Sequence, residues 1–304
     1  MTTVTLHMAA LILAGLLWRR LRPGGLDPEA VRTALTSSVY YLFLPALILR
    51  VLWTAPLGLD SLRLSATAGG AVLAGLALTA LGCRWCGAGR PVTGAMLLAG
   101  AWPNATYMGL PVLASLFGQA GEAVAIQYDL FACTPLLLTL GIHLAQRFGN
   151  TEAAAHPLHA LLRVPPLWAA AVAVALNAAG VPAVAGVIDG LRLAGAAVVP
   201  LMLFALGLSL RTDTWRAGQW RPLLVVAAVQ LMLLPPLAHG LGRLLGLSGV
   251  ALQGATLEAA MPSMVLGIVL CDRFGLDSAL YAAAVTLTTA LALLTLPLWF
   301  AVTA

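Results

Sequence analysis

The few polar side chains that could bind a ligand lie beside helix-breaking residues inside apolar stretches. The segment WPNATYMGLP, Trp102 to Pro111, places Asn104, Thr106 and Tyr107 between two prolines and next to a glycine. An amide in apolar surroundings needs a hydrogen-bond partner, because burying it without one is unfavourable. Asn104 is therefore expected either to donate to a carboxylate or to cap the half-helix that follows it, and Thr106 and Tyr107 offer hydroxyl contacts.

A second interrupted stretch, LEAAMPSMVLG at residues 257–267, holds Glu258, Pro262 and Ser263. An ionisable group deep in an apolar segment indicates a functional role by default, which makes Glu258 a candidate proton carrier. The alternative is a structural carboxyl that is neutral or paired with an arginine. Ser263 is expected to contact a ligand or to form a hydrogen bond between helices.

A third polar group, Gln127 and Asp129, lies about two turns into another apolar stretch. Asp129 or Glu258 could hold a sodium ion together with backbone carbonyls, since hard cations prefer oxygen ligands. We group Gln127 with these two acids as candidates for ion coupling. The alternative for Asp129 is an exposed acid near the membrane surface.

Signatures of enzymes and metalloproteins are missing from the sequence. It contains no dinucleotide-binding, P-loop, metalloprotease or nucleophile-elbow motif, so an enzyme is not expected. Its histidines and four cysteines do not form a metal-binding pattern. No cofactor is expected beyond a coupling ion, H⁺ or Na⁺.

The elements that position these residues must be membrane-spanning helices. Of the 304 residues, 61% are hydrophobic and 9% are charged, and the mean hydropathy is +0.96, which excludes a soluble domain. A span needs about 20 mostly apolar residues. Ten runs are expected, at residues 4–18, 31–53, 63–82, 91–117, 122–147, 161–180, 187–210, 221–243, 249–271 and 278–301.

The arginines predict the orientation of these helices. All sixteen basic residues are arginines, and twelve of them lie in the odd-numbered connections. The positive-inside rule then places those connections in the cytoplasm and both termini in the periplasm. Arginine without lysine, beside much alanine, suggests a bacterial inner-membrane protein from a GC-rich genome. Arg50, at the end of the second run, is expected to reach the membrane surface or to act as counter-charge for an anion.

The ten predicted helices divide into two halves that resemble each other. Pro45 in YYLFLPALIL and Pro200 in AAVVPLMLFAL are 155 residues apart, and the Phe-Gly pairs at 117–118 and 274–275 are 157 residues apart. Because five is odd, the second copy enters the membrane from the opposite side, as in many secondary transporters. The predicted repeats are residues 1–147 and 161–304, joined by a short cytoplasmic connection at 148–160.

The same offset relates the two interrupted stretches, so the fourth and ninth helices are both expected to be broken. Proline lacks an N–H and clashes with the preceding turn, so Pro103, Pro111 and Pro262 should open these helices. Freed backbone groups are tolerated at membrane depth only where protein or a water-filled cavity satisfies them. The half-helix dipoles suit an anion, commonly a carboxylate, whereas a single proline is more often a packing kink.

Several motifs together resemble the auxin efflux carrier family, which includes bacterial malonate and malate permeases: YLFLPALI, PNATYMGLP followed by FG, VVPLMLFALGLSL and EAAMPSMVLGIVLCDRFGLDSALY. The resemblance implies ten helices in two inverted repeats, with broken fourth and ninth helices crossing at the substrate site, similar to sodium–bile acid symporters. It implies a scaffold of helices 1, 2, 6 and 7 and a moving crossover domain of helices 3–5 and 8–10. The family's asparagine and prolines map onto Asn104, Pro111 and Pro262.

Two features depart from the plant carriers of that family. The central connection is short, and the third helix, 63–82, has no acidic residue, so auxin is not the expected substrate. The sequence predicts a secondary transporter of a small organic anion in a lipid bilayer, with no nucleic-acid partner and with a homodimer as one possible assembly. The alternatives are a sodium-coupled symporter of bile-acid-like or other bulky anions, and a ligand-binding membrane receptor or sensor.

Overall fold

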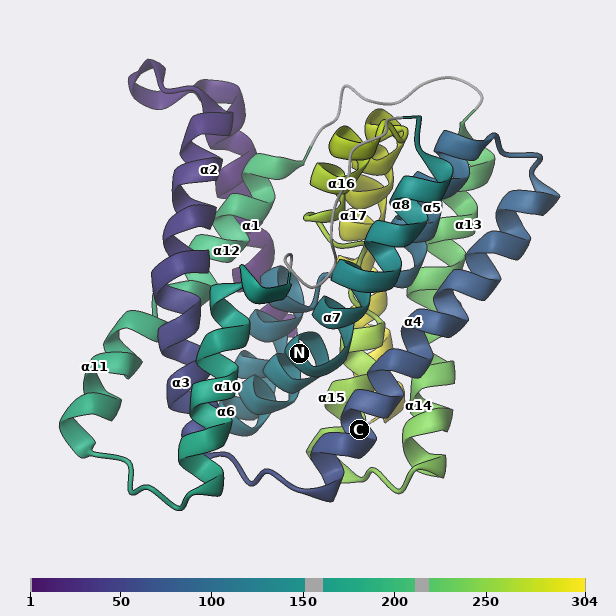
Figure 1. Cartoon of the computed structure of the whole chain (residues 1–304). Coiled ribbons are helices and arrows are strands. Elements are labelled where there is room, and N and C mark those ends of the chain that lie inside the picture. Colours follow the sequence, from purple (N-terminus) through teal and green to yellow (C-terminus); the bar gives the residue numbers. More distant parts are fainter. Residues whose placement is uncertain (1, 151–160, 211–218, 304) are drawn as a thin grey trace.

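The computed structural model describes residues 2–150, 161–210 and 219–303, and these form helices (Figure 1). The helices are α1 Thr2–Leu21, α2 Pro28–Ser38, α3 Leu44–Thr54, α4 Leu59–Trp85, α5 Arg90–Ala101, α6 Leu110–Tyr128, α7 Thr134–Leu136, α8 Ile142–Phe148, α10 Pro165–Ala178, α11 Ala185–Gly195, α12 Val198–Ser209, α13 Trp220–Ala228, α14 Leu234–Leu244, α15 Gly249–Ala259, α16 Gly267–Phe274 and α17 Ser278–Thr303. Within the described ranges there is no β-strand, only an isolated bridge between Pro103 and Ser263. The prediction of an all-helical membrane protein is confirmed.

Six of the described helical stretches are long and apolar enough to cross a membrane. They are Pro28–Thr54, Leu59–Trp85, Ala105–Phe148, Ala185–Ser209, Trp220–Leu244 and Ser278–Thr303. The predicted fourth and ninth spans do not form continuous helices, because each is interrupted near its middle, and α10 is short. The number of ten spans therefore stays a prediction.

The stretch Ala105–Phe148 contains more residues than one crossing needs. Its 44 residues would extend roughly 66 Å as one straight helix, about twice the hydrocarbon thickness. Gly118 interrupts α6 with φ 57 and ψ −138, so α6 consists of two helices that meet at this residue. Gly275, in the other Phe-Gly pair, ends α16 with φ 68. Both conformations lie in the left-handed region that favours glycine.

Prolines inside the apolar stretches are accommodated by widened π-helical turns. The turns are η2 Val39–Phe43, η3 Ala105–Gly109, η4 Asp129–Cys133, η5 Leu137–Gly141 and η6 Val229–Leu233. Four of these five are followed, two residues later, by Pro45, Pro111, Pro135 and Pro235. A proline ring clashes with the carbonyl four residues before it, and a wider turn relieves that clash.

The prediction that Pro111 opens the fourth helix is therefore wrong. Pro111 lies in the first turn of α6, directly after η3, and the helix continues through it. The opening lies at residues 102–104, between the end of α5 and the start of η3. Pro103 and Pro262 do lie in non-helical backbone, as expected.

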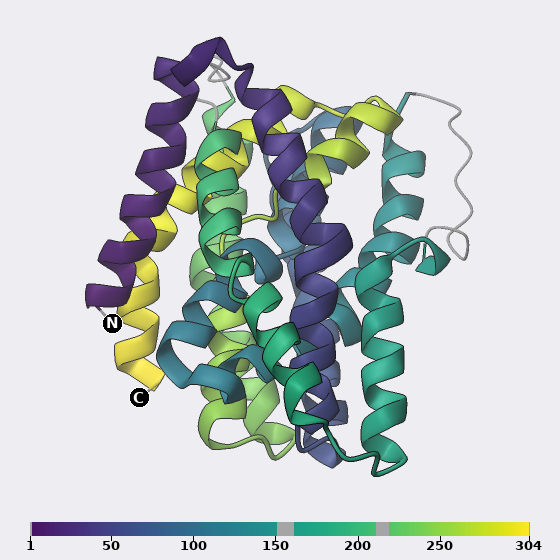
Figure 2. The same ribbon diagram turned by 90° about the vertical axis from the view of Figure 1, so that its left-hand side faces the viewer.

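The helices gather into two groups, which flank the centre of the molecule in Figure 1. In the left-hand group, α1 packs on α12, α2 on α12, and α3 on α10 and α11. In the right-hand group, α4 packs on α5 and α14, α15 packs on α14, and α17 packs on α5 and α13; α6, labelled left of centre in Figure 1, packs on α15. Figure 2 shows α1 of the first group beside α12, and also beside α17 of the second. The interrupted segments lie between these groups.

Candidate functional site

The two interrupted segments pair with each other through their backbones. The N–H of Asn104 donates to the carbonyl of Pro262 (2.7 Å), and the N–H of Met264 donates to the carbonyl of Trp102 (3.1 Å). These bonds enclose the antiparallel bridge between Pro103 and Ser263. Two helix breaks separated by about 160 residues in sequence thus form one local structure.

Other helices satisfy backbone groups that the breaks set free. Gln230 Nε2, on η6, donates to the carbonyl of Met261 (3.0 Å), and the Ser263 N–H donates to Thr288 Oγ1 on α17 (3.1 Å). Trp102 is fully buried, and its indole N–H donates to the carbonyl of Cys133. Backbone that is neither helix nor strand is stable at membrane depth only with such partners. The breaks are therefore fixed parts of the fold.

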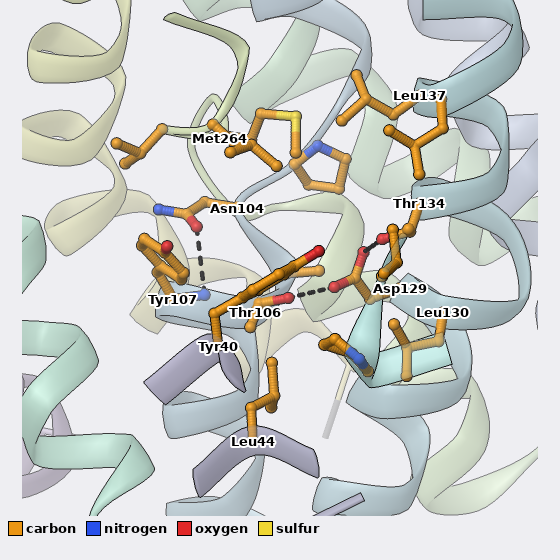
Figure 3. A pocket seen from close by; sticks show the side chains of 17 residues that line it. Tyr40, Leu44, Asn104, Thr106, Tyr107, Asp129, Leu130, Thr134, Leu137 and Met264 are labelled. Atoms are coloured by element: carbon orange, nitrogen blue, oxygen red, sulfur yellow. Dashed lines mark hydrogen bonds between the residues drawn. The ribbon is translucent and has the colours of Figure 1, made fainter. Parts of the chain in front are cut away.

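A cavity opens beside the paired breaks (Figure 3). It contains about 750 Å³ of empty space, counted to its open mouth. Both helix groups contribute to its wall: Tyr40, Leu44, Pro103, Asn104, Ala105, Thr106, Tyr107, Asp129, Leu130, Thr134, Leu137, Leu138, Val164, Pro166, Met264, Val265 and Leu266. The wall is mostly apolar, with a small cluster of polar groups.

Asn104 is the N-cap of η3 and lines this cavity. Its Oδ1 accepts a hydrogen bond from the N–H of Tyr107 (3.3 Å), while its Nδ2 has no hydrogen-bond partner among the described residues. The side chain is 4% exposed. A buried amide nitrogen without a partner is unfavourable. One half of the amide thus caps the helix, and the other half offers donors to a ligand.

Asp129 lies opposite Asn104 in the close-up view (Figure 3). Thr106 Oγ1 donates to one carboxylate oxygen, and Thr134 Oγ1 lies 2.9 Å from the other. The carboxylate is therefore held by hydroxyls from both η3 and the start of α7. The alternative of an exposed acid is wrong, because the Asp129 side chain is only partly exposed and contacts these two threonines.

Only some of the remaining predicted substrate residues lie in the cavity wall. Thr106 and Tyr107 line the cavity, whereas Pro111, Pro262 and Ser263 do not. The Ser263 side chain is fully buried, and its Oγ has no partner within the described part of the chain. The predicted ion-coupling residue Gln127 is 6% exposed and also lies outside the cavity wall.

Glu258 is fully buried on α15, and neither of its carboxyl oxygens has a hydrogen-bond partner among the described residues. It packs directly against η3, because a Cβ added to Gly109 would overlap both carboxyl oxygens. Thr106, three residues earlier in the same turn, contacts Asp129. The π-helical turn η3 therefore lies between two acidic side chains, one inside the cavity and one behind it.

Sequence reasoning missed the part of the wall that comes from the left-hand group. Four residues at η2, α3 and the start of α10 line the cavity: Tyr40, Leu44, Val164 and Pro166. The motif YYLFLPALI marked the first two residues as belonging to a recognisable segment. Nothing in the spacing of that motif indicates which side chains face the fourth helix.

A second cavity, with about 540 Å³ of empty space to its mouth, lies toward the arginine-rich connections. Its polar residues are Glu29 and Arg32 on α2, Ser209 on α12 and Asp272 on α16. Val265 lines both cavities. A single side chain therefore belongs to the walls of both spaces.

At the opposite end of α3, polar contacts tie the two groups of helices together. Arg50 forms an ion pair with Glu122, in which the two side chains are 15% and 17% exposed. Gln119 Nε2 donates to Thr54 Oγ1 (2.9 Å). Arg50 does not line the cavity, so the alternative of a counter-charge for a bound anion is wrong: Glu122 already supplies its partner.

Comparison with known proteins gives one family and two informative relatives. The model of a family described as "Membrane transport protein" matches residues 4–300. An uncharacterized transporter of Methanothermobacter thermautotrophicus is 35% identical over 208 residues, which is 68% of this chain and 67% of the relative. An uncharacterized transporter of Methanocaldococcus jannaschii is 28% identical over 211 residues, again 68% and 67%. Both relatives are archaeal, which gives no support to the compositional prediction of a bacterial source.

Proposed function

Because the chain belongs to the membrane transport protein family, the family that its motifs resemble, we propose that it is a secondary transporter of small organic anions. The observation that carries this proposal is the cavity beside the paired helix breaks, into which Asn104 presents an amide nitrogen without a partner. A substrate carboxylate there accepts hydrogen bonds from Nδ2. It also lies near the N-terminal end of η3 and α6, where the helix dipole favours negative charge.

The architecture behind this proposal is ten spans in two inverted repeats, 1–147 and 161–304. In its support, the backbones of residues 102–104 and 262–264 pair in antiparallel fashion. The Phe-Gly pairs at 117–118 and 274–275, at the predicted offset, both end helices with positive φ at glycine. The fourth and ninth helices cross at the substrate site in this account.

Alternating access requires one group of helices to move against the other. We assign α1–α3 and α10–α12 to a scaffold, and α4–α8 and α13–α17 to a crossover domain. Both cavities have walls from both units, as a moving interface requires. The ion pair of Arg50 with Glu122 also joins the two units, so it must break in any state that opens at that end.

Within the site, we propose Asn104, Thr106 and Tyr107 as the residues that contact substrate. Pro262 and Ser263 act indirectly, because they shape the break whose backbone holds Asn104 in position. Pro111 acts through η3, since the widened turn before it sets the direction of Thr106. These roles separate residues that touch the ligand from residues that fix the backbone.

Ion coupling is proposed to involve the acids on either side of η3, with H⁺ or Na⁺ as the ion. An isolated ionised carboxyl is very costly to bury, so Glu258 holds a proton or a cation in the folded protein. Gln127, on α6 two residues before Asp129, is the weakest of the three candidates. Sodium-coupled transport of a bulky anion is the second candidate function, and the buried carboxyl of Glu258 without a partner is the observation that favours it.

The proposed location is the cytoplasmic membrane, with the arginine-rich connections in the cytoplasm and both termini outside. Assembly into a homodimer is also proposed, by analogy with the family that the sequence resembles. Translocation, which separates a transporter from a ligand-binding receptor of the same fold, is tested by uptake of labelled carboxylates into liposomes that contain the purified protein. We expect Asn104→Ala to abolish uptake. Unchanged uptake by this variant rules out the proposed placement of substrate.

A further inference from the structure

The charges of the cavity wall restrict the charge of the ligand that can bind there. This inference rests on the proposed carboxylate site. Asp129 is the charged residue in the described cavity wall, which otherwise contains apolar and neutral polar side chains. Arg32 on α2 acts electrostatically on Tyr107 of the cavity wall but pairs with Glu29, and Arg50 near the end of α3 pairs with Glu122. No arginine lines the described cavity wall, so a carboxylate bound at Asn104 faces another carboxylate there.

The groups around Asp129 do not remove this conflict. Tyr40, Tyr107, Cys133 and Glu258 interact with it electrostatically, and none of them is basic. Of the helices packed on η4, α7 and α10 contain no ionisable residue. The charged residues of α4 lie toward its two ends, and Glu122 of α6 is paired with Arg50. Two like charges in a low-dielectric cavity repel strongly.

The hydrogen bonds of Asp129 suit a group that gains and loses a positive partner. Each of its oxygens meets one threonine hydroxyl. A hydroxyl can donate to an ionised carboxylate or accept from a protonated one, so both forms fit without movement of the backbone. A cation beside the carboxylate also leaves these two bonds in place.

We infer that Asp129 makes each bound carboxylate bring one positive charge into the cavity, as a proton, a sodium ion or an ammonium group of the same molecule. Asn104 receives the carboxylate, and Asp129 receives the positive charge across the cavity. The preferred ligands are consequently monocarboxylates that bind with a cation, or zwitterionic amino acids. Dicarboxylates of the malonate type are disfavoured, because they add a second negative charge opposite Asp129.

Isothermal titration calorimetry of the purified protein tests this inference. Propionate, alanine and malonate are titrated at one pH in two buffers of different ionisation enthalpy, each with and without sodium. Proton uptake appears as a dependence of the binding enthalpy on the buffer. Sodium uptake appears as an affinity that depends on sodium. If the ammonium group of the ligand supplies the charge, alanine binds without proton uptake and without dependence on sodium.

For wild type we expect the carboxylate that binds to show one of these three signatures, with malonate weakest. If the charge is a proton, the apparent Kd rises roughly tenfold for each pH unit above the titration of the site. Asp129→Asn, which keeps both threonine contacts, should lose the signature and gain affinity for malonate. Asp60→Asn, the same change at an exposed residue of α4, should behave as wild type.

The outcomes separate this inference from the proposed function. Binding of propionate to wild type without proton or sodium uptake overturns the inference and leaves the carboxylate site intact. So does tighter binding of malonate than of propionate. Failure of all three probes to bind either wild type or Asp129→Asn contradicts the carboxylate site itself. The wild-type titrations alone decide the matter if the variant does not fold.

Discussion

At the scale of single residues, Asn104 combines two roles in one side chain. Its Oδ1 caps η3 and its Nδ2 faces the cavity without a partner. Asn104→Asp keeps the acceptor for the Tyr107 N–H but removes the amide donors and adds negative charge. We expect this variant to lose carboxylate binding and to unfold at a lower temperature than wild type, because the new carboxyl is buried opposite Asp129.

Asn104→Ala, in contrast, should lose both roles and about 1 kcal/mol of stability, the usual cost of a lost cap. Calorimetric unfolding, with and without ligand, measures both effects. Equal ligand affinity in Asn104→Asp and wild type would show that the amide serves only as a cap.

Gly109 is the residue that lets Glu258 pack against η3. Gly109→Ala should destabilise the protein by about 1–3 kcal/mol, the usual effect of overpacking, because the new methyl group overlaps the carboxyl oxygens. In a Glu258→Ala background the same substitution should cost little. Gly69→Ala is a matched control, since its Cβ would meet Leu136 at an ordinary 3.7 Å. Additive effects of the two substitutions in denaturant unfolding would contradict the contact.

The sequence located the polar residues of the site better than it located their partners. Asn104 and Glu258 could be found because they stand beside prolines in apolar runs, a local signal. The contact of Thr106 with Asp129 joins residues 23 positions apart on different helices, and its existence depends on how η3 packs against η4. No spacing rule within either segment encodes that distance.

At the scale of helices, the π-helical turns connect proline positions to side-chain directions. Pro111→Ala restores an N–H that can bond to the Tyr107 carbonyl, so η3 can tighten into an α-helix. We expect Thr106 to turn away from Asp129 and ligand affinity to fall, while stability stays level or rises. Pro297→Ala makes the same substitution inside α17, which does not line the cavity, and should leave affinity unchanged. Equal affinity in the two variants, by calorimetric titration, would refute the link.

The helix breaks show why the pattern of prolines alone was insufficient. Proline marks both the opening at Pro103 and the continued helix at Pro111, because a widened turn can absorb the missing N–H. Which outcome occurs depends on partners such as the Pro262 carbonyl, supplied by a segment far away in sequence. Composition thus predicted that these segments are helical. It did not predict at which proline each helix is interrupted.

The ion pair of Arg50 with Glu122 offers a test of the proposed moving interface. Arg50→Gln or Glu122→Gln removes a mostly buried ionic contact between the two units and should favour the state open at that end. The measurement is labelling of Leu44→Cys, in a background without native cysteines, by a membrane-impermeant thiol reagent added outside. We expect several-fold faster labelling in each variant and near wild-type labelling in the exchange Arg50→Glu with Glu122→Arg. Unchanged labelling in all three would remove this contact from the transport cycle.

At the scale of the whole molecule, two paired helix breaks and the cavity beside them lie between the two helix groups of a membrane transport protein. Composition predicted a membrane protein, and the motifs repeated in the two halves predicted which two helices would be interrupted. Neither predicted the contribution of Tyr40 or Pro166 to the cavity, because the relative placement of the two helix groups follows from packing over the whole chain. The substrate class depends on that placement.

The most direct test of the central claim is the unfolding temperature of the purified protein in the presence of a panel of mono- and dicarboxylates. A ligand at 100 times its Kd stabilises the folded state by about 2.7 kcal/mol. Asn177→Ala is the control, because its amide bonds to three carbonyls at the end of α3, away from the cavity. We predict that at least one carboxylate raises the unfolding temperature of wild type and of Asn177→Ala but not of Asn104→Ala. An equal rise in Asn104→Ala, or no rise with any carboxylate, would contradict the claim that this cavity binds the transported anion.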